Sequence, residues 1–156
     1  EVRIEQTLKH YAIVRTSWLY YTEGKNFVKT MLRLAQTRDT LTVVNDQIGS
    51  PTFAGDLAEA VVHLVSDSST LKEGEIYHFS NEGVASWYDF AEAIFSLGSQ
   101  NVAVTPVPSS AYPTVAPRPF YSVLSKEKMK NRFTLSVSHW RDALARCLAQ
   151  HQEYGL

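Results

Sequence analysis

The sequence predicts an α/β fold, in which strands and helices alternate along the chain. Short runs of β-branched and apolar residues alternate with longer segments whose apolar residues recur at helical spacing. Loops rich in Gly, Pro and Asn separate these segments. The length of 156 residues is typical of one domain or of a piece of a larger one.

The first elements alternate helix and strand twice. A helical stub over residues 1–9 leads into a strand at 11–16, whose β-branched apolar residues suit a buried position. The next helix is expected over 26–36, because its apolar residues follow helical spacing, and Asn26 can cap its start. A second short strand follows at 41–44.

The middle of the chain repeats this alternation. Gly49 and Pro51 force a loop before a helix that is expected over 54–66. The expected apolar face of this helix consists of Leu57, Val61, Leu64 and Val65. Residues 75–80 alternate apolar and polar types, which predicts a further strand.

The last part of the chain again predicts helices around one strand. Ser86 and Asp89 resemble a capping box that opens a helix. The residues of this helix expected to point inward are Phe90, Ile94 and Phe95. A strand at 102–107 leads into a proline-rich loop that no helix interior tolerates. A short helix over 125–131 and a final amphipathic helix capped by Ser138 follow. The apolar residues of the final helix are Trp140, Ala143, Leu144 and Leu148.

The composition excludes several classes of function. Fifteen Lys and Arg against sixteen Asp and Glu give a formal charge of −1, without the basic stripe of nucleic-acid-binding proteins. No apolar run approaches the roughly 20 residues of a membrane span. The five histidines lack the spacing of metal ligands. Cys147 is the only cysteine, which predicts a reducing, cytoplasmic setting and an inert thiol packed in the last helix.

Few residues of the chain predict chemistry on their own. There is no glycine-rich nucleotide-binding motif, nucleophile elbow or metalloprotease motif. Trp18 follows the strand at 11–16, at the sheet edge where α/β proteins bind ligands, and either contacts a ligand or anchors a loop. Arg118 lies between two prolines that restrict its backbone, so it is either a phosphate clamp or a solvated charge. Asn26 is a helix cap or part of an anion site, and Asp46 a turn former.

Several stretches together resemble one family. They are Arg15–Tyr20 (RTSWLY), Asn26–Arg33 (NFVKTMLR) and Val44–Thr52 (VNDQIGSPT), the last of which is followed by DLA at 56–58. Two later elements are RP at 118–119 with Ser122 and Leu124, and WRDAL at 140–144. In this order they resemble the C-terminal half of the dTDP-4-dehydrorhamnose reductases, which are extended short-chain dehydrogenase/reductases.

The resemblance implies an NAD(P)H-dependent reductase that converts dTDP-4-dehydro-L-rhamnose to dTDP-L-rhamnose. In this family the glycine-rich cofactor-binding turn and the catalytic residues lie in an N-terminal half that this chain lacks. We therefore expect no catalytic residue here, no activity of the chain alone, and a cofactor, NADH or NADPH, bound mainly by the missing half. Residues 1–156 would form the C-terminal substrate-binding portion, with 11–16 and 75–80 as strands of the missing Rossmann domain.

The resemblance also implies roles for single residues. Trp18 matches a tryptophan that lines the dTDP-sugar site of the family. Asn26 and Arg118 match residues that lie near the diphosphate in sugar-nucleotide relatives. Ser17 is expected near the nicotinamide. Gly49 stands where several relatives carry a further arginine, so that neutralising the phosphates would rest more heavily on Arg118.

Two further expectations concern partners. The alternative to an enzyme is a non-catalytic member of the same fold, like the regulatory subunit of methionine adenosyltransferase, which works by contacting a protein partner. Strands that lack their usual neighbours leave open sheet edges, which recruit other chains. We therefore expect either a homo-oligomer formed through these edges, or an incomplete sheet with exposed apolar residues near Ile13 and Tyr77.

Overall fold

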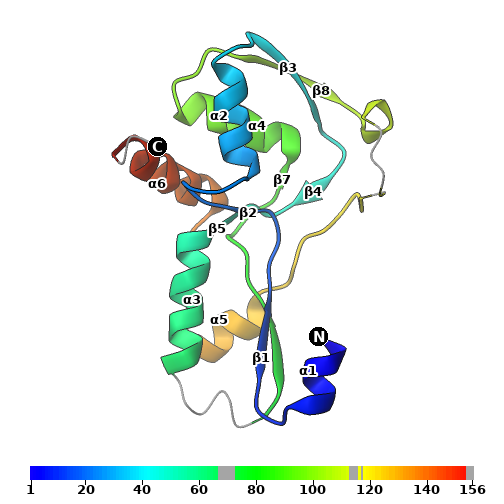
Figure 1. The fold of residues 1–156 in the computed structure, drawn as a ribbon, viewed down its shortest axis with the longest axis vertical. Helices are drawn as coiled ribbons and strands as arrows, with labels where there is room; N and C mark the ends of the chain where they lie inside the picture. The colour runs from blue at the N-terminus through cyan, green and yellow to red at the C-terminus, as the bar shows by residue number, and fades with distance from the viewer. Residues whose placement is uncertain (67–72, 113–115, 117, 154–156) are drawn as a thin grey trace.

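The computed structural model describes residues 1–66, 73–112, 116 and 118–153. It confirms the predicted alternation of helices and strands (Figure 1). The helices are α1 (Val2–Thr7), α2 (Phe27–Ala35), α3 (Ala54–Ser66), α4 (Trp87–Leu97), α5 (Glu127–Phe133) and α6 (Trp140–Glu153). The strands are β1 (Ala12–Arg15), β2 (Leu19–Tyr20), β3 (Thr40–Val44), β4 (Ile48–Gly49), β5 (Thr52–Phe53), β6 (Glu75–His78), β7 (Ala85–Ser86) and β8 (Ala103–Val107).

The strands form four pairs, each between segments far apart in the sequence. β1 pairs with β6, β2 with β5 and β3 with β8 in parallel, whereas β4 and β7 are antiparallel. The β3–β8 pair lies with α2 and α4 at one end of the molecule, and the β1–β6 pair lies with α1, α3 and α5 at the other (Figure 1). The short pairs β2–β5 and β4–β7 lie between these two ends.

The larger hydrophobic core lies where α2, α4 and α6 meet. α4 begins with the predicted capping box of Ser86 and Asp89. The three residues of α4 that were expected to point inward are all buried: Phe90, Ile94 and Phe95. The expected apolar residues of α6 are buried as well: Trp140, Ala143, Leu144 and Leu148. Cys147 lies among them, and burial raises the pKa of its thiol to about 12, so the thiol stays protonated at neutral pH.

The expected cap of the last helix is wrong by one residue. α6 begins at Trp140, and the ring Nδ1 of His139, not the Ser138 hydroxyl, accepts a hydrogen bond from the Arg141 backbone N–H at 3.2 Å. The reason is a contact with a distant segment of the chain. The Ser138 carbonyl accepts from the backbone N–H of Glu82 at 2.9 Å, which holds Ser138 in an extended segment beside the chain after β6.

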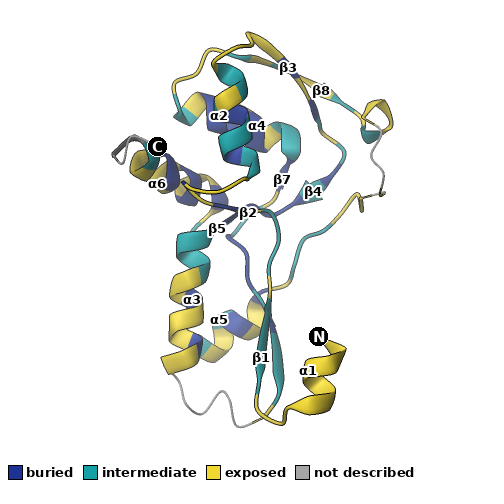
Figure 2. Cartoon of the chain, in the orientation of Figure 1, coloured by how far each residue is buried: buried dark blue, intermediate teal, exposed yellow. Residues whose placement is uncertain are grey.

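The smaller hydrophobic core lies between α3, α5 and the β1–β6 pair. The predicted apolar face of α3 is only half right. Leu57 packs against this core and Leu64 is buried in it together with Ala60. Val61 and Val65, however, are 37% and 61% exposed (Figure 2). The β6 and α5 side chains of this core meet only the Leu57 side of α3, so the stripe that carries the two valines faces outward.

β1 and β6 pair only with each other within the part of the chain that the structure describes. That this pair belongs to a larger sheet stays a prediction, and the expected exposure of Tyr77 is wrong. Tyr77 is 2% exposed, because it packs in the smaller core, with its ring 5.5 Å from that of Phe133. Ile13 is half-buried. Self-association through this sheet stays a prediction.

Candidate functional site

A cavity of about 530 Å³ opens between α2, β3 and the start of α4. Apolar side chains form much of its wall: Phe27, Met31, Leu34, Leu41, Val43 and Trp87. Polar side chains complete it: Thr30, Arg38, Thr42, Gln47, Tyr112 and Arg118. A largely apolar hollow with a few polar groups is typical of sites for small organic ligands.

The charges at this cavity are all positive. Arg38 and Arg118 line it, and no acidic side chain is among its described lining residues. Both arginines are exposed, so they remain available to a ligand. A guanidinium presents a planar set of donors that fits phosphate oxygens in pairs. The cavity therefore suits a ligand that has both a flat or apolar part and an anionic group.

Arg118 lines this cavity, and its role as a phosphate clamp stays a prediction. The chain beside it is fixed to β4, because the Ile48 N–H donates to the Phe120 carbonyl at 2.8 Å and the Ser122 N–H donates to the Ile48 carbonyl at 2.9 Å. Pro119 belongs to this segment, whereas Pro117, the other flanking proline, lies outside the described residues. The arginine thus extends from a segment that is anchored to the sheet.

Trp18 does not line the cavity; it lies directly behind a ring that does. Its indole stacks on that of Trp87 with ring centroids 3.5 Å apart and planes 8° from parallel. Trp18 has a left-handed backbone, with φ at 46°, which few residues other than Gly adopt. Gly49 makes room for the ring, since a Cβ there would lie 2.5 Å from it. Trp18 therefore fixes Trp87, and its own contact with a ligand stays a prediction.

Asn26 acts as the helix cap that the sequence predicts. Its Oδ1 accepts from the Lys29 N–H at 3.1 Å, and its Nδ2 donates to the carbonyls of Tyr21 at 2.8 Å and Glu23 at 3.1 Å. The side chain is fully engaged in fixing the start of α2, whose next residue, Phe27, lines the cavity. The structure does not bring Asn26 itself into the cavity wall, and its contact with a diphosphate stays a prediction.

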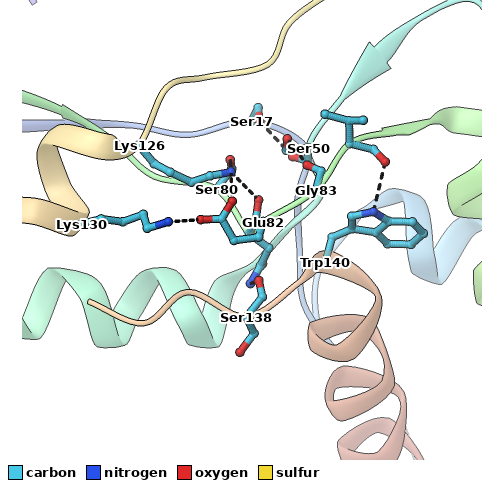
Figure 3. Close-up of polar contacts among 11 residues, drawn as sticks. Ser17, Ser50, Ser80, Glu82, Gly83, Lys126, Lys130, Ser138 and Trp140 are labelled. Carbon is cyan, nitrogen blue, oxygen red and sulfur yellow. Dashed lines mark hydrogen bonds and ion pairs between the residues drawn. The ribbon is translucent and has the colours of Figure 1, made fainter. Parts of the chain in front are cut away.

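Ser17 lies beyond the carboxyl end of β1 and is linked to two later loops (Figure 3). Its hydroxyl donates to the Ser50 carbonyl at 3.0 Å, and the Ser50 hydroxyl donates to the Gly83 carbonyl at 2.8 Å. The neighbouring Thr16 hydroxyl is buried and has no hydrogen-bond partner in the structure. These contacts hold the ends of β1 and β6 together, and the role of Ser17 toward a cofactor stays a prediction.

Asp46 does more than form a turn. Its Oδ2 accepts from both the backbone N–H and the hydroxyl of Ser109, each at 2.9 Å. These bonds join the end of β3 to the segment that follows β8 and leads to Tyr112 at the cavity. Asp46 therefore fixes two parts of the cavity wall relative to each other.

Of the residues that line the cavity, sequence reasoning assigned only Arg118 to a site; those it missed include Arg38, Gln47 and Trp87. Trp87 directly follows the capping residue Ser86, and Gln47 directly follows Asp46, so both lie within motifs that were otherwise interpreted. Their shared position becomes visible only through the β4–β7 pairing, in which Ile48 faces Ser86. No sequence signal distinguishes Arg38 from a solvated charge.

Asn81 joins the two ends of the molecule. It is fully buried, and its Oδ1 accepts from the Phe53 N–H at 2.8 Å. Its Nδ2 donates to Asp56 at 2.5 Å and to the Ser138 carbonyl at 3.2 Å. Asp56 in turn accepts two hydrogen bonds from Arg146, at 2.5 and 2.7 Å. The network ties β5, α3 and α6 to the loop after β6, and so holds the two cores in one arrangement.

Glu82, in the same loop, binds two lysines that flank the start of α5 (Figure 3). Its carboxylate lies 3.3 Å from Nζ of the buried Lys126 and 2.6 Å from Nζ of Lys130. Lys126 also donates to the Asn81 carbonyl at 2.9 Å. Burial alone would raise the pKa of Glu82, but the hydrogen bonds and charges of the two lysines outweigh it and lower that pKa below its ordinary value.

This lowered pKa predicts an acid-sensitive contribution to stability. A carboxyl group whose pKa is lower in the folded than in the unfolded chain stabilises the fold above its unfolded pKa, and the effect disappears as the pH falls through the folded pKa. We expect the free energy of unfolding of the wild type to exceed that of Glu82→Gln near neutral pH, and the difference to shrink between about pH 5 and pH 3. Urea unfolding across this range measures it.

The matched control is Glu59→Gln, because Glu59 is an exposed carboxylate on α3. Its difference from the wild type should stay small at every pH. A difference for Glu82→Gln that does not change with pH would show that the two lysines do not stabilise the charged form of Glu82.

None of the helices within the described residues is long and apolar enough to cross a bilayer.

Comparison with known proteins gives a consistent result. The family model described as the RmlD substrate binding domain matches residues 1–153. The spore coat polysaccharide biosynthesis protein SpsK of Bacillus subtilis is 45% identical over 150 residues, which cover 96% of this chain and 51% of SpsK. A dTDP-4-dehydrorhamnose reductase of Aggregatibacter actinomycetemcomitans is 45% identical over 141 residues, which cover 85% of this chain and 48% of that enzyme. The chain thus spans about half the length of these curated relatives.

Solved structures agree with the sequences. A crystal structure of dTDP-4-dehydrorhamnose reductase from Bacillus anthracis in complex with NADP matches with a TM-score of 0.86 and 39% identity, covering 94% of this chain and 50% of that one. A dTDP-4-dehydrorhamnose reductase from Clostridium acetobutylicum matches with a TM-score of 0.83 and 40% identity, covering 91% of this chain and 49% of that one. A dTDP-glucose 4,6-dehydratase from Bacillus anthracis, at 17% identity and a TM-score of 0.67, shares the fold.

Proposed function

The chain belongs to the RmlD substrate-binding domain family, and we propose that it is the substrate-binding part of an NAD(P)H-dependent reductase that converts dTDP-4-dehydro-L-rhamnose to dTDP-L-rhamnose. The observation that carries this proposal is the cavity between α2, β3 and α4. Its apolar wall accepts a base and a sugar ring, and its two arginines accept a diphosphate. The relatives named dTDP-4-dehydrorhamnose reductase suggest a dTDP-linked sugar, which combines a base, a sugar ring and a diphosphate in one ligand.

Each site residue has a place in this proposal. Arg118 binds the diphosphate, and Asn26 fixes the start of α2, whose next residue, Phe27, lines the cavity. Trp18 fixes Trp87, against which it stacks, in the wall of the site. Asp46 holds the segment around Ser109, which leads to the cavity, against the end of β3. The chain binds and orients the substrate, and none of its described residues is proposed as a catalytic group.

The cofactor, NADPH or NADH, would lie mainly on an N-terminal half whose Rossmann sheet β1 and β6 extend. The residues present fit such a group: the carboxyl ends of parallel strands are where α/β sheets bind ligands, and the Thr16 hydroxyl there is buried without a partner in the structure. Ser17 lies next to it. When bound, the cofactor supplies the hydride that reduces the C4 carbonyl. The open edges of the β1–β6 pair would accept that half, and we place the enzyme in the cytoplasm.

Calorimetric titration tests the proposal directly. We expect the 156-residue chain to bind dTDP-L-rhamnose and dTDP at a single site, and to leave NADPH unoxidised when mixed with dTDP-4-dehydro-L-rhamnose. No binding of either nucleotide by the folded chain would contradict the proposal. Binding to a protein partner in place of a nucleotide would favour a regulatory subunit of the same fold.

A further inference from the structure

Gln47 differs from the two arginines of the cavity, because the residue as a whole is buried, while its amide has no hydrogen-bond partner in the described part of the chain and is not among the side-chain atoms that are closed off from solvent. It lies between β3 and β4, lines the cavity, and is only 9% exposed. No hydrogen bond to its side chain exists within the described part of the chain. The amide of a residue that lines a cavity and has no protein partner is free to hydrogen-bond a ligand there.

The backbone on both sides of Gln47 is fixed. Asp46, before it, is bound to Ser109 through two hydrogen bonds. Ile48, after it, faces Ser86 in the antiparallel β4–β7 pair, and this register brings Gln47 alongside Trp87. The backbone therefore holds Gln47 beside an aromatic ring that also lines the cavity. A ligand that binds there meets the residue without a rearrangement of its backbone.

The chemistry of the amide narrows the group that it binds. A carboxamide presents one acceptor and one donor side by side. Phosphate oxygens are acceptors only, so a phosphate would satisfy the Gln47 NH₂ and leave its carbonyl oxygen facing negative charge. The two arginines already suit the diphosphate. The imide edge of a thymine or uracil base carries an N–H next to a carbonyl oxygen, which is the complement of a carboxamide.

We propose that Gln47 recognises the imide edge of the thymine base of a dTDP-linked ligand, with the base against the apolar wall next to Trp87. This inference rests on the proposed function. Gln47 is then a specificity-determining residue that recognises the base, while Arg118 binds the diphosphate. In the absence of ligand the Gln47 amide makes no hydrogen bond within the described part of the chain.

The experiment compares three ligands on two proteins by calorimetry. The ligands are dTDP, N3-methylthymidine diphosphate, which lacks the imide hydrogen, and inorganic pyrophosphate, which lacks the base. The proteins are the 156-residue wild-type chain and its Gln47→Met variant, in which an unbranched apolar side chain of similar length replaces the amide. We expect wild-type affinity for dTDP to exceed that for the N3-methyl compound about 10-fold. The variant should bind both alike, about 10-fold more weakly than wild type binds dTDP.

Pyrophosphate measures the contribution of the phosphates without the base. Its affinity should be equal for the two proteins. The melting temperature of Gln47→Met should be no lower than that of the wild type, because the removed amide has no partner to lose; Gln47→Leu repeats the measurement if the Met variant unfolds. Equal affinity of both proteins for dTDP would overturn the role of Gln47 and leave the proposed function standing. So would a variant that still prefers dTDP over the N3-methyl compound. Failure of the wild type to bind dTDP would overturn both.

Discussion

Replacing Arg118 with Ala should weaken the binding of dTDP-L-rhamnose by about 10- to 100-fold, the effect expected for losing charge-assisted hydrogen bonds to a diphosphate. Arg118 lines the cavity and lies two residues before Phe120, whose carbonyl is hydrogen-bonded to β4. Its partner Arg38 lines the same cavity and would retain part of the attraction. Calorimetric titration of the two proteins measures the change.

Arg141→Ala is the matched control. Arg141 is an exposed arginine at the start of α6, outside the lining of the cavity, so its removal changes the net charge by the same amount. Its affinity for dTDP-L-rhamnose should remain within about twofold of the wild type at moderate salt, where distant surface charges are screened. Equal affinities of wild type and Arg118→Ala would exclude Arg118 from the diphosphate site.

Of the substitutions proposed here, Asn81→Ala should cause the largest loss in the free energy of unfolding. The change leaves the buried Phe53 N–H without its acceptor and removes one hydrogen bond from Asp56, which keeps those from Arg146. An unpaired buried polar group costs about 1–3 kcal/mol, so we expect the free energy of unfolding to fall by about 2–3 kcal/mol. For a chain of this length the melting temperature should fall by about 4–12 °C, as scanning calorimetry can measure.

Asn101→Ala serves as its control, since Asn101 is an exposed asparagine outside the helices and strands. Its melting temperature should match that of the wild type within about 1 °C, the range of ordinary surface substitutions. A small effect of Asn81→Ala would mean that the loop after β6 adapts and that the two cores are joined by other contacts.

The sequence predicts those features of the fold that depend on neighbouring residues. The expected bounds of 54–66 coincide with α3, and the capping box at Ser86 needs only a residue three positions away. The errors concern contacts between distant segments. The exposed stripe at Val61 and Val65 depends on where α5 packs, and the cap at His139 depends on the pairing of Ser138 with Glu82.

The same limit applies to the candidate site. Arg118 was found from its motif, and the structure places it at the cavity. Trp18 and Asn26 were assigned to the ligand through the resemblance, yet the structure engages their side chains with Trp87 and with the backbone around α2. Gln47 and Trp87 were missed, because only the pairing of β4 with β7 brings them together. A site assembled from several loops shows its full composition only in three dimensions.

The strand pairing also determines how the chain reaches its fold. Ala12 pairs with Glu75 and Thr40 with Ala103, so no strand pair described here closes through a short hairpin. Each core draws on segments from both halves of the sequence, and neither can form while the other half is still unstructured. Folding dominated by such non-local contacts is slow, because long loops must close before any contact stabilises them. During synthesis, the smaller core must wait for α5, and the larger one for α6, which follows α5 in the chain.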